Sequence, residues 1–170
     1  ERRNILQMKP YASARDEFKG EADIFLDANE NPYPSPYNRY PDPLQWRVKE
    51  KLAAIKGVKP EQIFLGNGSD EAIDLLIRAF CEPNHDSILI TEPTYGMYSV
   101  CAEVNAVNVQ RVLLTPDFDL DLDAFPKTFD ATTKVLFLCS PNNPTGNLLN
   151  HHKIKEVLKR FYGLVVIDEA

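Results

Sequence analysis

The sequence lacks the features that mark a chain for a membrane, for nucleic acid or for secretion. No apolar run in its 170 residues approaches the length that spans a bilayer. The charged start, Glu1-Arg2-Arg3, is not followed by the apolar core of a signal peptide. The formal net charge is −6, which argues against a nucleic-acid or membrane surface. We therefore expect a cytoplasmic protein that binds neither nucleic acid nor membrane.

Cysteine and histidine are scarce, at three residues each. Cys81, Cys101 and Cys139 are odd in number, widely spaced and set among apolar residues, which predicts buried, reduced thiols rather than disulfides. The histidines form no zinc-binding spacing with these cysteines, so we expect no metal site. The pair His151-His152 is expected in the solvated first turn of a helix.

What is present is typical of a globular protein, with 44% apolar and 26% charged residues and no repeat. Residues 1 to about 43 form a proline-broken arm with one expected strand, and after it amphipathic helical segments alternate with short apolar runs. This alternation predicts an α/β fold with a mostly parallel sheet covered on both faces. Strands are expected at 23–26, 63–65, 87–90, 107–114, 135–139 and 164–167, and helices at 44–55, from Ser69 to Phe80, through Tyr98 and Ala102, and from the capping residue Asn150 to Phe161.

Two predicted strands end in polar residues. The loop Ser-Pro-Asn-Asn-Pro-Thr-Gly at 140–146 follows one strand directly, and Asp168 follows another. In open α/β sheets, ligands bind at the carboxyl ends of the strands. A rigid asparagine loop beside a carboxylate suits a cofactor with an oxygen on one edge and a protonated nitrogen on another.

The segment Gly66-Asn67-Gly68 admits more than one interpretation. The helix that follows could bind a phosphate through its first-turn N–H groups, or its Ser and acidic residues could simply cap it. The order strand, Gly-x-Gly, helix, strand and then Glu92 also imitates a dinucleotide-binding unit. Glu71 replaces the third glycine of that fingerprint, and the asparagine loop has no role in such a unit.

The motifs at 140–146 and at 165–170 (Val-Val-Ile-Asp-Glu-Ala) together resemble the pyridoxal-phosphate-dependent aminotransferases of fold type I. Four further motifs narrow the resemblance to the histidinol-phosphate aminotransferases. They are Leu-Asp-Ala-Asn-Glu-Asn-Pro at 26–32, Arg-Tyr-Pro at 39–41, Gly-Asn-Gly-Ser-Asp-Glu at 66–71 and Pro-Thr-Tyr-Gly-Met-Tyr at 93–98. The match runs in family order over essentially the whole chain.

The resemblance implies the three-layer large domain of a fold type I enzyme, with residues 36–170 as its first part. Residues 1–35 would form an arm that belongs to the small domain, and the chain would be incomplete. The implied reaction moves an amino group between glutamate and imidazole-acetol phosphate, giving histidinol phosphate and 2-oxoglutarate. Another class I/II aminotransferase, a phosphothreonine-type decarboxylase of the same fold and a dinucleotide-binding enzyme remain alternatives.

The resemblance also implies roles for individual residues toward pyridoxal phosphate in a homodimer. Asp168 would pair with the pyridine nitrogen, Asn143 would bind the phenolic oxygen, and Tyr95 would stack on the ring. The Schiff-base lysine and the substrate-binding arginines are not in this chain, so we expect residues 1–170 alone to be inactive. The phosphate would be bound by Gly68, Ser69 and Asp70 of the same subunit and by Tyr40 of the partner subunit. The substrate would be bound by Tyr11 and Asn29.

Overall fold

The computed structural model describes residues 1–13, 17–18 and 20–170, which form two compact units. One unit consists of Glu1–Gln7 and Gly66–Ala170, and the other of Met8–Leu65. The expected boundary at residue 35 stays a prediction. No helix within the described ranges is long and apolar enough to cross a membrane.

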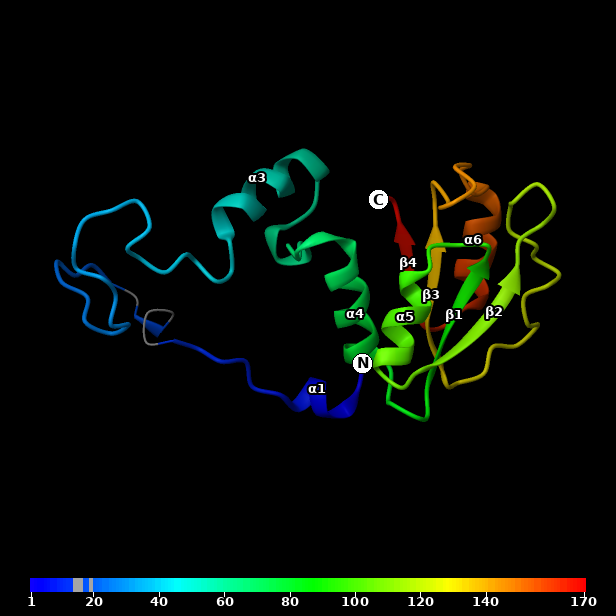
Figure 1. Cartoon of the computed structure of the whole chain (residues 1–170), viewed down its shortest axis with the longest axis horizontal. Coiled ribbons are helices and arrows are strands. Elements are labelled where there is room, and N and C mark those ends of the chain that lie inside the picture. Colours follow the sequence, from blue (N-terminus) through cyan, green and yellow to red (C-terminus); the bar gives the residue numbers. More distant parts are fainter. Residues whose placement is uncertain (14–16, 19) are drawn as a thin grey trace. The chain divides into compact units, whose positions relative to one another are not determined.

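The larger unit is built on a four-stranded sheet with the order β2-β1-β3-β4, in which all neighbouring strands are parallel (Figure 1). Its strands are β1 (Ser87–Glu92), β2 (Asn108–Leu113), β3 (Thr133–Cys139) and β4 (Leu164–Asp168). Its helices are α1 (Arg3–Gln7), α4 (Gly68–Phe80), α5 (Met97–Val104) and α6 (His151–Arg160).

Alternate residues of the central strands point to opposite faces of the sheet, and helices cover both faces. Ile88 and Ile90 of β1 and Phe137 of β3 pack with α4 and α5, whereas Leu89 and Leu136 pack with α6 (Figure 1). These five side chains are at most 1% exposed. The expected three-layer arrangement with a mostly parallel sheet is confirmed.

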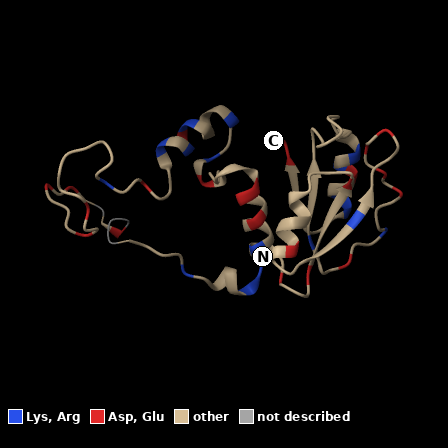
Figure 2. Ribbon diagram, viewed as in Figure 1, with Lys and Arg blue, Asp and Glu red and all other residues tan. Residues whose placement is uncertain are grey.

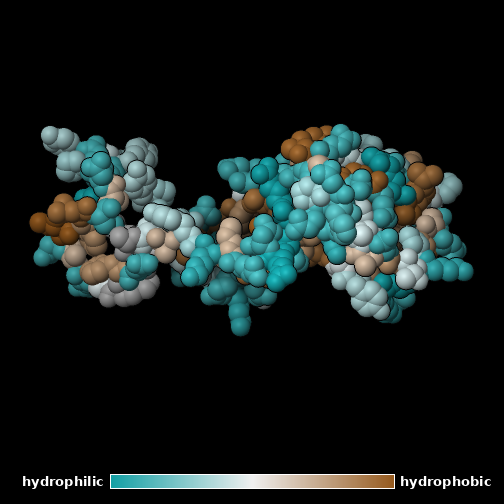
Figure 3. All heavy atoms as spheres, turned by 90° about the horizontal axis from the view of Figure 1, so that it is seen from below, coloured by the Kyte–Doolittle hydropathy of each residue, from teal (hydrophilic) through white to brown (hydrophobic). Residues whose placement is uncertain are grey.

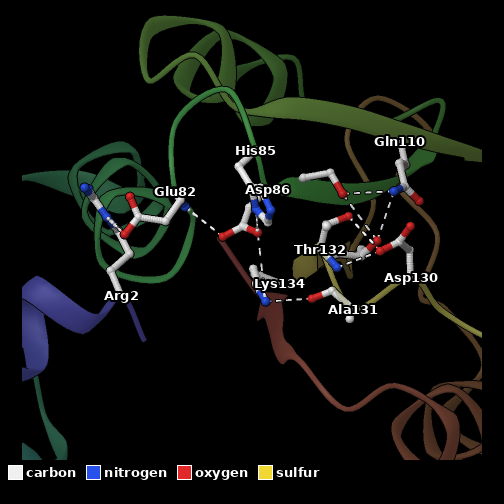
Figure 4. Close-up of polar contacts among 11 residues, drawn as sticks. Arg2, Glu82, His85, Asp86, Gln110, Asp130, Ala131, Thr132 and Lys134 are labelled. Carbon is white, nitrogen blue, oxygen red and sulfur yellow. Dashed lines mark hydrogen bonds and ion pairs between the residues drawn. The ribbon is translucent and has the colours of Figure 1, made fainter.

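A buried carboxylate organises the amino-terminal edge of this sheet (Figure 4). Asp86, which precedes β1, is 2% exposed. Its carboxylate accepts the backbone N–H of Glu82 at 2.8 Å and lies 2.8 Å from Nδ1 of His85. Nζ of Lys134 lies 3.9 Å from the same carboxylate. These contacts compensate for the hydration that the Asp86 carboxylate loses on burial.

A second polar group at this edge joins three strands. Nε2 of Gln110 donates to Oγ of Ser87 and to Oγ1 of Thr133, both at 2.9 Å. Ser87 begins β1 and Thr133 begins β3, while Gln110 lies in β2. The amino edge is therefore held by polar side chains that satisfy one another.

The three cysteines are free and buried, as the sequence predicts. Burial is the main cause that raises the pKa of Cys81 to about 12, and the nearby Asp86 carboxylate is the second. A thiol of this kind stays protonated and unreactive near neutral pH.

The smaller unit contains α3 (Trp46–Lys56) and the short 3-10 helix η1 (Pro60–Gln62). The predicted helix at 44–55 is confirmed with its start shifted, because the Asp42 carboxylate accepts the N–H groups of Leu44 at 2.9 Å and Trp46 at 2.8 Å. Gly57 ends α3 with a φ of 67°, a left-handed conformation that glycine adopts without steric cost.

Exposed apolar side chains occur in both units (Figure 3). The apolar face predicted for α3 is among them, since Val48 is 51% and Ile55 76% exposed. Only Ala53 of α3 is buried within the described part of the chain. The segment is helical, as the spacing of its apolar residues predicts, but the described residues leave much of its apolar face exposed.

Two predicted strands are wrong. Residues 23–26 and 63–65 form no strand. A strand needs a neighbour to pair its backbone N–H and C=O groups, and neither segment pairs with another strand among the described residues. The other strands lie where the sequence predicts them, with ends that differ by at most two residues.

Candidate active site

Asp168 lies at the carboxyl-terminal edge of the sheet, as its place after an apolar run predicts. It is the last residue of β4 and is paired with Cys139, the last residue of β3. The backbone N–H of Ser140 donates to the carbonyl oxygen of Asp168 at 2.8 Å. The carboxylate is thereby placed beside the start of the asparagine loop.

The Asp168 carboxylate is held by one donor on each oxygen. Oη of Tyr98 donates to Oδ2 at 2.6 Å, and the N–H of Ala170 donates to Oδ1 at 3.0 Å. Burial raises the pKa of Tyr98, and the bond to Asp168 raises it further, so the phenol remains a neutral donor. The Tyr98 ring is fully buried and stacks on Phe137, with ring centroids 4.8 Å apart.

Sequence reasoning placed Tyr98 in a helix but gave it no role. The available signal was a phenol in the buried stripe of α5, where the other buried residues are Cys101 and Ala102. A buried tyrosine hydroxyl normally has a hydrogen-bond partner, but the sequence does not show which one.

Tyr95 connects two parts of this edge. Its hydroxyl donates to Oδ1 of Asp70 at 3.1 Å, and this bond raises the pKa of Tyr95. Its ring meets that of Tyr98 edge-on, with centroids 5.7 Å apart. The half-buried Tyr95 therefore lies between the first turn of α4 and the tyrosine that holds Asp168.

No side chain among the described residues caps the first turn of α4, so its backbone donors stay open. Gly68 begins the helix with a φ of 78°, one residue before the predicted start at Ser69. Asp70 and Glu71 lie in this turn (Figure 2). The Glu71 carboxylate accepts the N–H and side-chain amide of Asn67, and no side-chain bond from Asn67 caps the helix. The N–H groups of a first helical turn have no intrahelical partner, so they can receive an anion.

The two adjacent asparagines of the loop at 140–146 have different environments. Asn142 is 3% exposed, and its Nδ2 donates to the Pro93 carbonyl at 2.9 Å and to Oγ1 of Thr145 at 2.7 Å. The N–H of Gly146 donates to the Asn142 carbonyl at 2.6 Å. The Asn143 side chain is exposed and has no hydrogen bond to the residues that the structure describes. Asn142 thus builds the loop, a role that sequence reasoning missed, and Asn143 presents an unused amide.

The remaining predicted contacts lie in the unit formed by Met8–Leu65. Tyr11 is 91% exposed and Tyr40 73% exposed, and Asn29 is an exposed residue with a φ of 49°. Their roles toward substrate and phosphate stay predictions.

Comparison with known proteins gives this edge its context. The family model for aminotransferase class I and II matches residues 24–170. The chain belongs to this aminotransferase family. Histidinol-phosphate aminotransferases from Parabacteroides distasonis and Bacteroides thetaiotaomicron are 60% and 58% identical to it over 99% of its residues. The aminotransferase chain spans about half the length of these curated relatives, 49% in both cases.

Solved structures agree with the fold. The histidinol-phosphate aminotransferase from Clostridium acetobutylicum is 31% identical with a TM-score of 0.65, covering 78% of this chain and 39% of that one. The N-succinyldiaminopimelate aminotransferase from Mycobacterium tuberculosis is 32% identical with a TM-score of 0.68, covering 78% of this chain and 38% of that one. The two neighbours have different substrates in their names, so fold similarity does not distinguish between substrates.

The dinucleotide-binding alternative loses its first element. That fingerprint requires a strand directly before Gly-x-Gly, and residues 63–65 form none. With the family established, the segment at 66–71 is the start of an aminotransferase helix.

Proposed function

We propose that the full-length protein transfers an amino group between glutamate and imidazole-acetol phosphate, giving histidinol phosphate and 2-oxoglutarate in histidine biosynthesis. The observation that carries this proposal is the 51–60% identity, over 99% of the chain, to relatives named histidinol-phosphate aminotransferase. We further propose that the protein acts in the cytoplasm as a homodimer.

The residues at the carboxyl edge fit pyridoxal phosphate. Asp168 offers a carboxylate fixed on both oxygens, the exposed amide of Asn143 has a donor to offer, and the first turn of α4 has open N–H groups. These groups match a pyridine nitrogen, a phenolic oxygen and a phosphate. When bound, the cofactor supplies an electron sink for the charge left on the substrate carbon.

The chain's own residues have distinct tasks in this proposal. Asp168 holds a proton on the pyridine nitrogen, because a nearby carboxylate favours the cationic form. Asn143 binds the phenolic oxygen, and Tyr95 covers the ring and excludes water. The N–H groups of Gly68, Ser69 and Asp70 bind the phosphate.

Tyr40 completes the phosphate site of the other subunit in this proposal, and Tyr11 and Asn29 lie on the substrate side. The support for Tyr40 is its exposed position in a proline-punctuated segment and the prevalence of two-fold dimers. A hydroxyl that donates to a phosphate forms a charge-assisted bond. Tyr40→Ala and Asp168→Ala dimers, reassembled together, should regain about a quarter of wild-type activity, because about half are hybrids with one intact site each.

A substrate panel tests the reaction. The full-length protein, loaded with pyridoxal phosphate, should form 2-oxoglutarate from glutamate when imidazole-acetol phosphate is the acceptor. Borohydride should fix the cofactor to one lysine. Turnover only with other amino acceptors would favour a different class I/II aminotransferase. Release of carbon dioxide without amino transfer would favour a decarboxylase of the same fold.

A further inference from the structure

A glutamate is buried in a segment whose other side chains are mostly exposed. The side chain of Glu30 is 4% exposed, whereas Tyr33, Tyr37 and Tyr40 are 77%, 91% and 73% exposed. Glutamate is rarely buried unless its charge is paired, because it loses the hydration of its carboxylate. The burial of Glu30 therefore indicates that its carboxylate serves the conformation of this segment.

The two carboxylate oxygens of Glu30 bind two consecutive residues. Oε2 accepts a hydrogen bond from Nη1 of Arg39 at 2.8 Å, and Oε1 accepts the backbone N–H of Tyr40 at 2.8 Å. Bonds to an ionised carboxylate are about twice as strong as bonds between neutral groups. One side chain thus neutralises its charge and fixes the backbone at the same point.

A second contact closes the loop of residues 30–40 beside the first. Nδ2 of Asn38 donates to the Asn31 carbonyl at 3.1 Å, and Oδ1 of Asn31 accepts the N–H of Tyr33 at 3.0 Å. Residues 30–40 contain no helix or strand, so no regular hydrogen-bond ladder determines their shape. The side chains of Glu30 and Asn38 join the two ends of this loop instead, as in other compact surface loops.

The position of Tyr40 depends on this closure. Its ring is largely exposed, so side-chain packing does not determine where the hydroxyl points. Its backbone N–H, however, is bound to a buried carboxylate. A residue that starts from a fixed backbone position loses less conformational entropy when its side chain binds a ligand.

We propose that Glu30 is a positioning residue that closes the 30–40 loop and presents Tyr40 to the phosphate group of the cofactor in the partner subunit's site. This inference rests on the function proposed above for Tyr40. Glu30 touches neither cofactor nor substrate in this proposal and acts through its bonds to Arg39 and Tyr40.

The first test measures the loop directly in the full-length protein. Hydrogen exchange at the Tyr40 amide should become about tenfold faster or more in Glu30→Ala, because its hydrogen bond to a charged acceptor is lost. Glu30→Gln retains an oxygen for this amide and should show a smaller increase, which covers the case in which Glu30→Ala does not fold. Glu50→Ala, which removes an exposed glutamate from α3, is the matched control and should exchange like the wild type.

The second test links the loop to the site. Glu30→Ala and Tyr40→Ala should each weaken pyridoxal-phosphate binding by about tenfold, the effect of one charge-assisted bond. The double variant should bind no more weakly than Tyr40→Ala alone, because both changes remove one interaction. Glu30→Ala should recover activity when reassembled with Asp168→Ala but not with Tyr40→Ala, since the first pair alone forms one complete site per hybrid.

Each outcome decides the matter. Unchanged exchange at Tyr40 in both Glu30 variants would overturn the inference, whatever the activity. Faster exchange with unchanged cofactor affinity, or recovery of activity with Tyr40→Ala, would also overturn it. If Tyr40→Ala binds cofactor normally, or if it is defective and fails to complement Asp168→Ala, the shared site proposed for Tyr40 is wrong. Glu30 then only closes the loop, which exchange at Tyr40 would still show.

Discussion

The two edges of the parallel sheet use similar polar residues for different purposes. At the amino edge, the buried Asp86 is bound by its neighbours, and Gln110 joins side chains of two other strands. At the carboxyl edge, Asp168 is equally well held, but the adjacent Asn143 amide is exposed and without a partner among the described residues. A polar group satisfied within the protein contributes stability, whereas an oriented group with unused capacity can bind a ligand.

The largest effect should come from Asp168. Asp168→Ala in the full-length enzyme should lower the transamination rate at least ~10²-fold, about 2.7 kcal/mol of barrier, because the pyridine nitrogen loses its anionic partner. The rate is measured with saturating cofactor, and circular dichroism checks the fold. Gln110→Ala, at the other edge, should keep the wild-type rate. A folded Asp168→Ala enzyme with a near-normal rate would show that this carboxylate is not the partner.

Asp86 should show the opposite behaviour. Asp86→Ala should lower the free energy of unfolding by about 2 kcal/mol, because the N–H of Glu82 and the side chains of His85 and Lys134 lose the carboxylate that they contact. Urea denaturation measures the loss, and the rate per folded molecule should stay unchanged. If the rate falls while stability does not, the two edges are not separate in function.

Substitution of Tyr98 should affect both stability and rate, because this buried residue donates a hydrogen bond to Asp168 of the candidate site. Tyr98→Phe keeps the ring stacked on Phe137 but removes the donor to Asp168, and should lower the free energy of unfolding by about 1.5 kcal/mol. Its rate should fall less than that of Asp168→Ala, since the carboxylate remains. Equal loss of rate in the two variants would mean that Tyr98 does more than orient Asp168.

A pair of asparagines at the carboxyl edge should give the smallest and most selective effects. Oδ1 of Asn150 accepts the His152 N–H at 2.9 Å, so Asn150→Ala should lower the free energy of unfolding by about 1 kcal/mol without changing cofactor affinity. Asn143→Ala should weaken cofactor binding and leave the free energy of unfolding unchanged. Thermal melts and cofactor titrations distinguish them, and the same response from both would contradict the distinction between structural and ligand-binding asparagines.

Local signals in the sequence predicted most of the larger unit correctly. The short apolar runs of β1 and β3 and the cap at Asn150 act over a few residues, as does the stop at Gly57 in the smaller unit, so they can be recognised from neighbouring positions alone. The two wrong strands, at 23–26 and 63–65, share those signals but have no strand to pair with in the described residues. Pairing partners are not a local property of a segment.

The candidate site shows the same limit. Asp168 and the asparagine loop were found because each follows a predicted strand, and parallel strands end at one edge. The contributions of Tyr98, Asn142 and Glu30 were missed, since a buried polar residue needs a partner that the sequence does not identify.

The sequence by itself determined the fold class, the family and the edge of the sheet where the polar loops meet, because periodicity, turn residues and motif order are properties of neighbouring positions. Only the tertiary structure decided which polar groups are already satisfied and which remain open. Tyr98 and Asp168 are 70 positions apart, and Asn142 and Pro93 are 49 apart. Contacts of that range form only when the sheet brings its strand ends together. They distinguish Asn142, which builds the loop, from the adjacent Asn143, whose side chain has no hydrogen bond to the described residues.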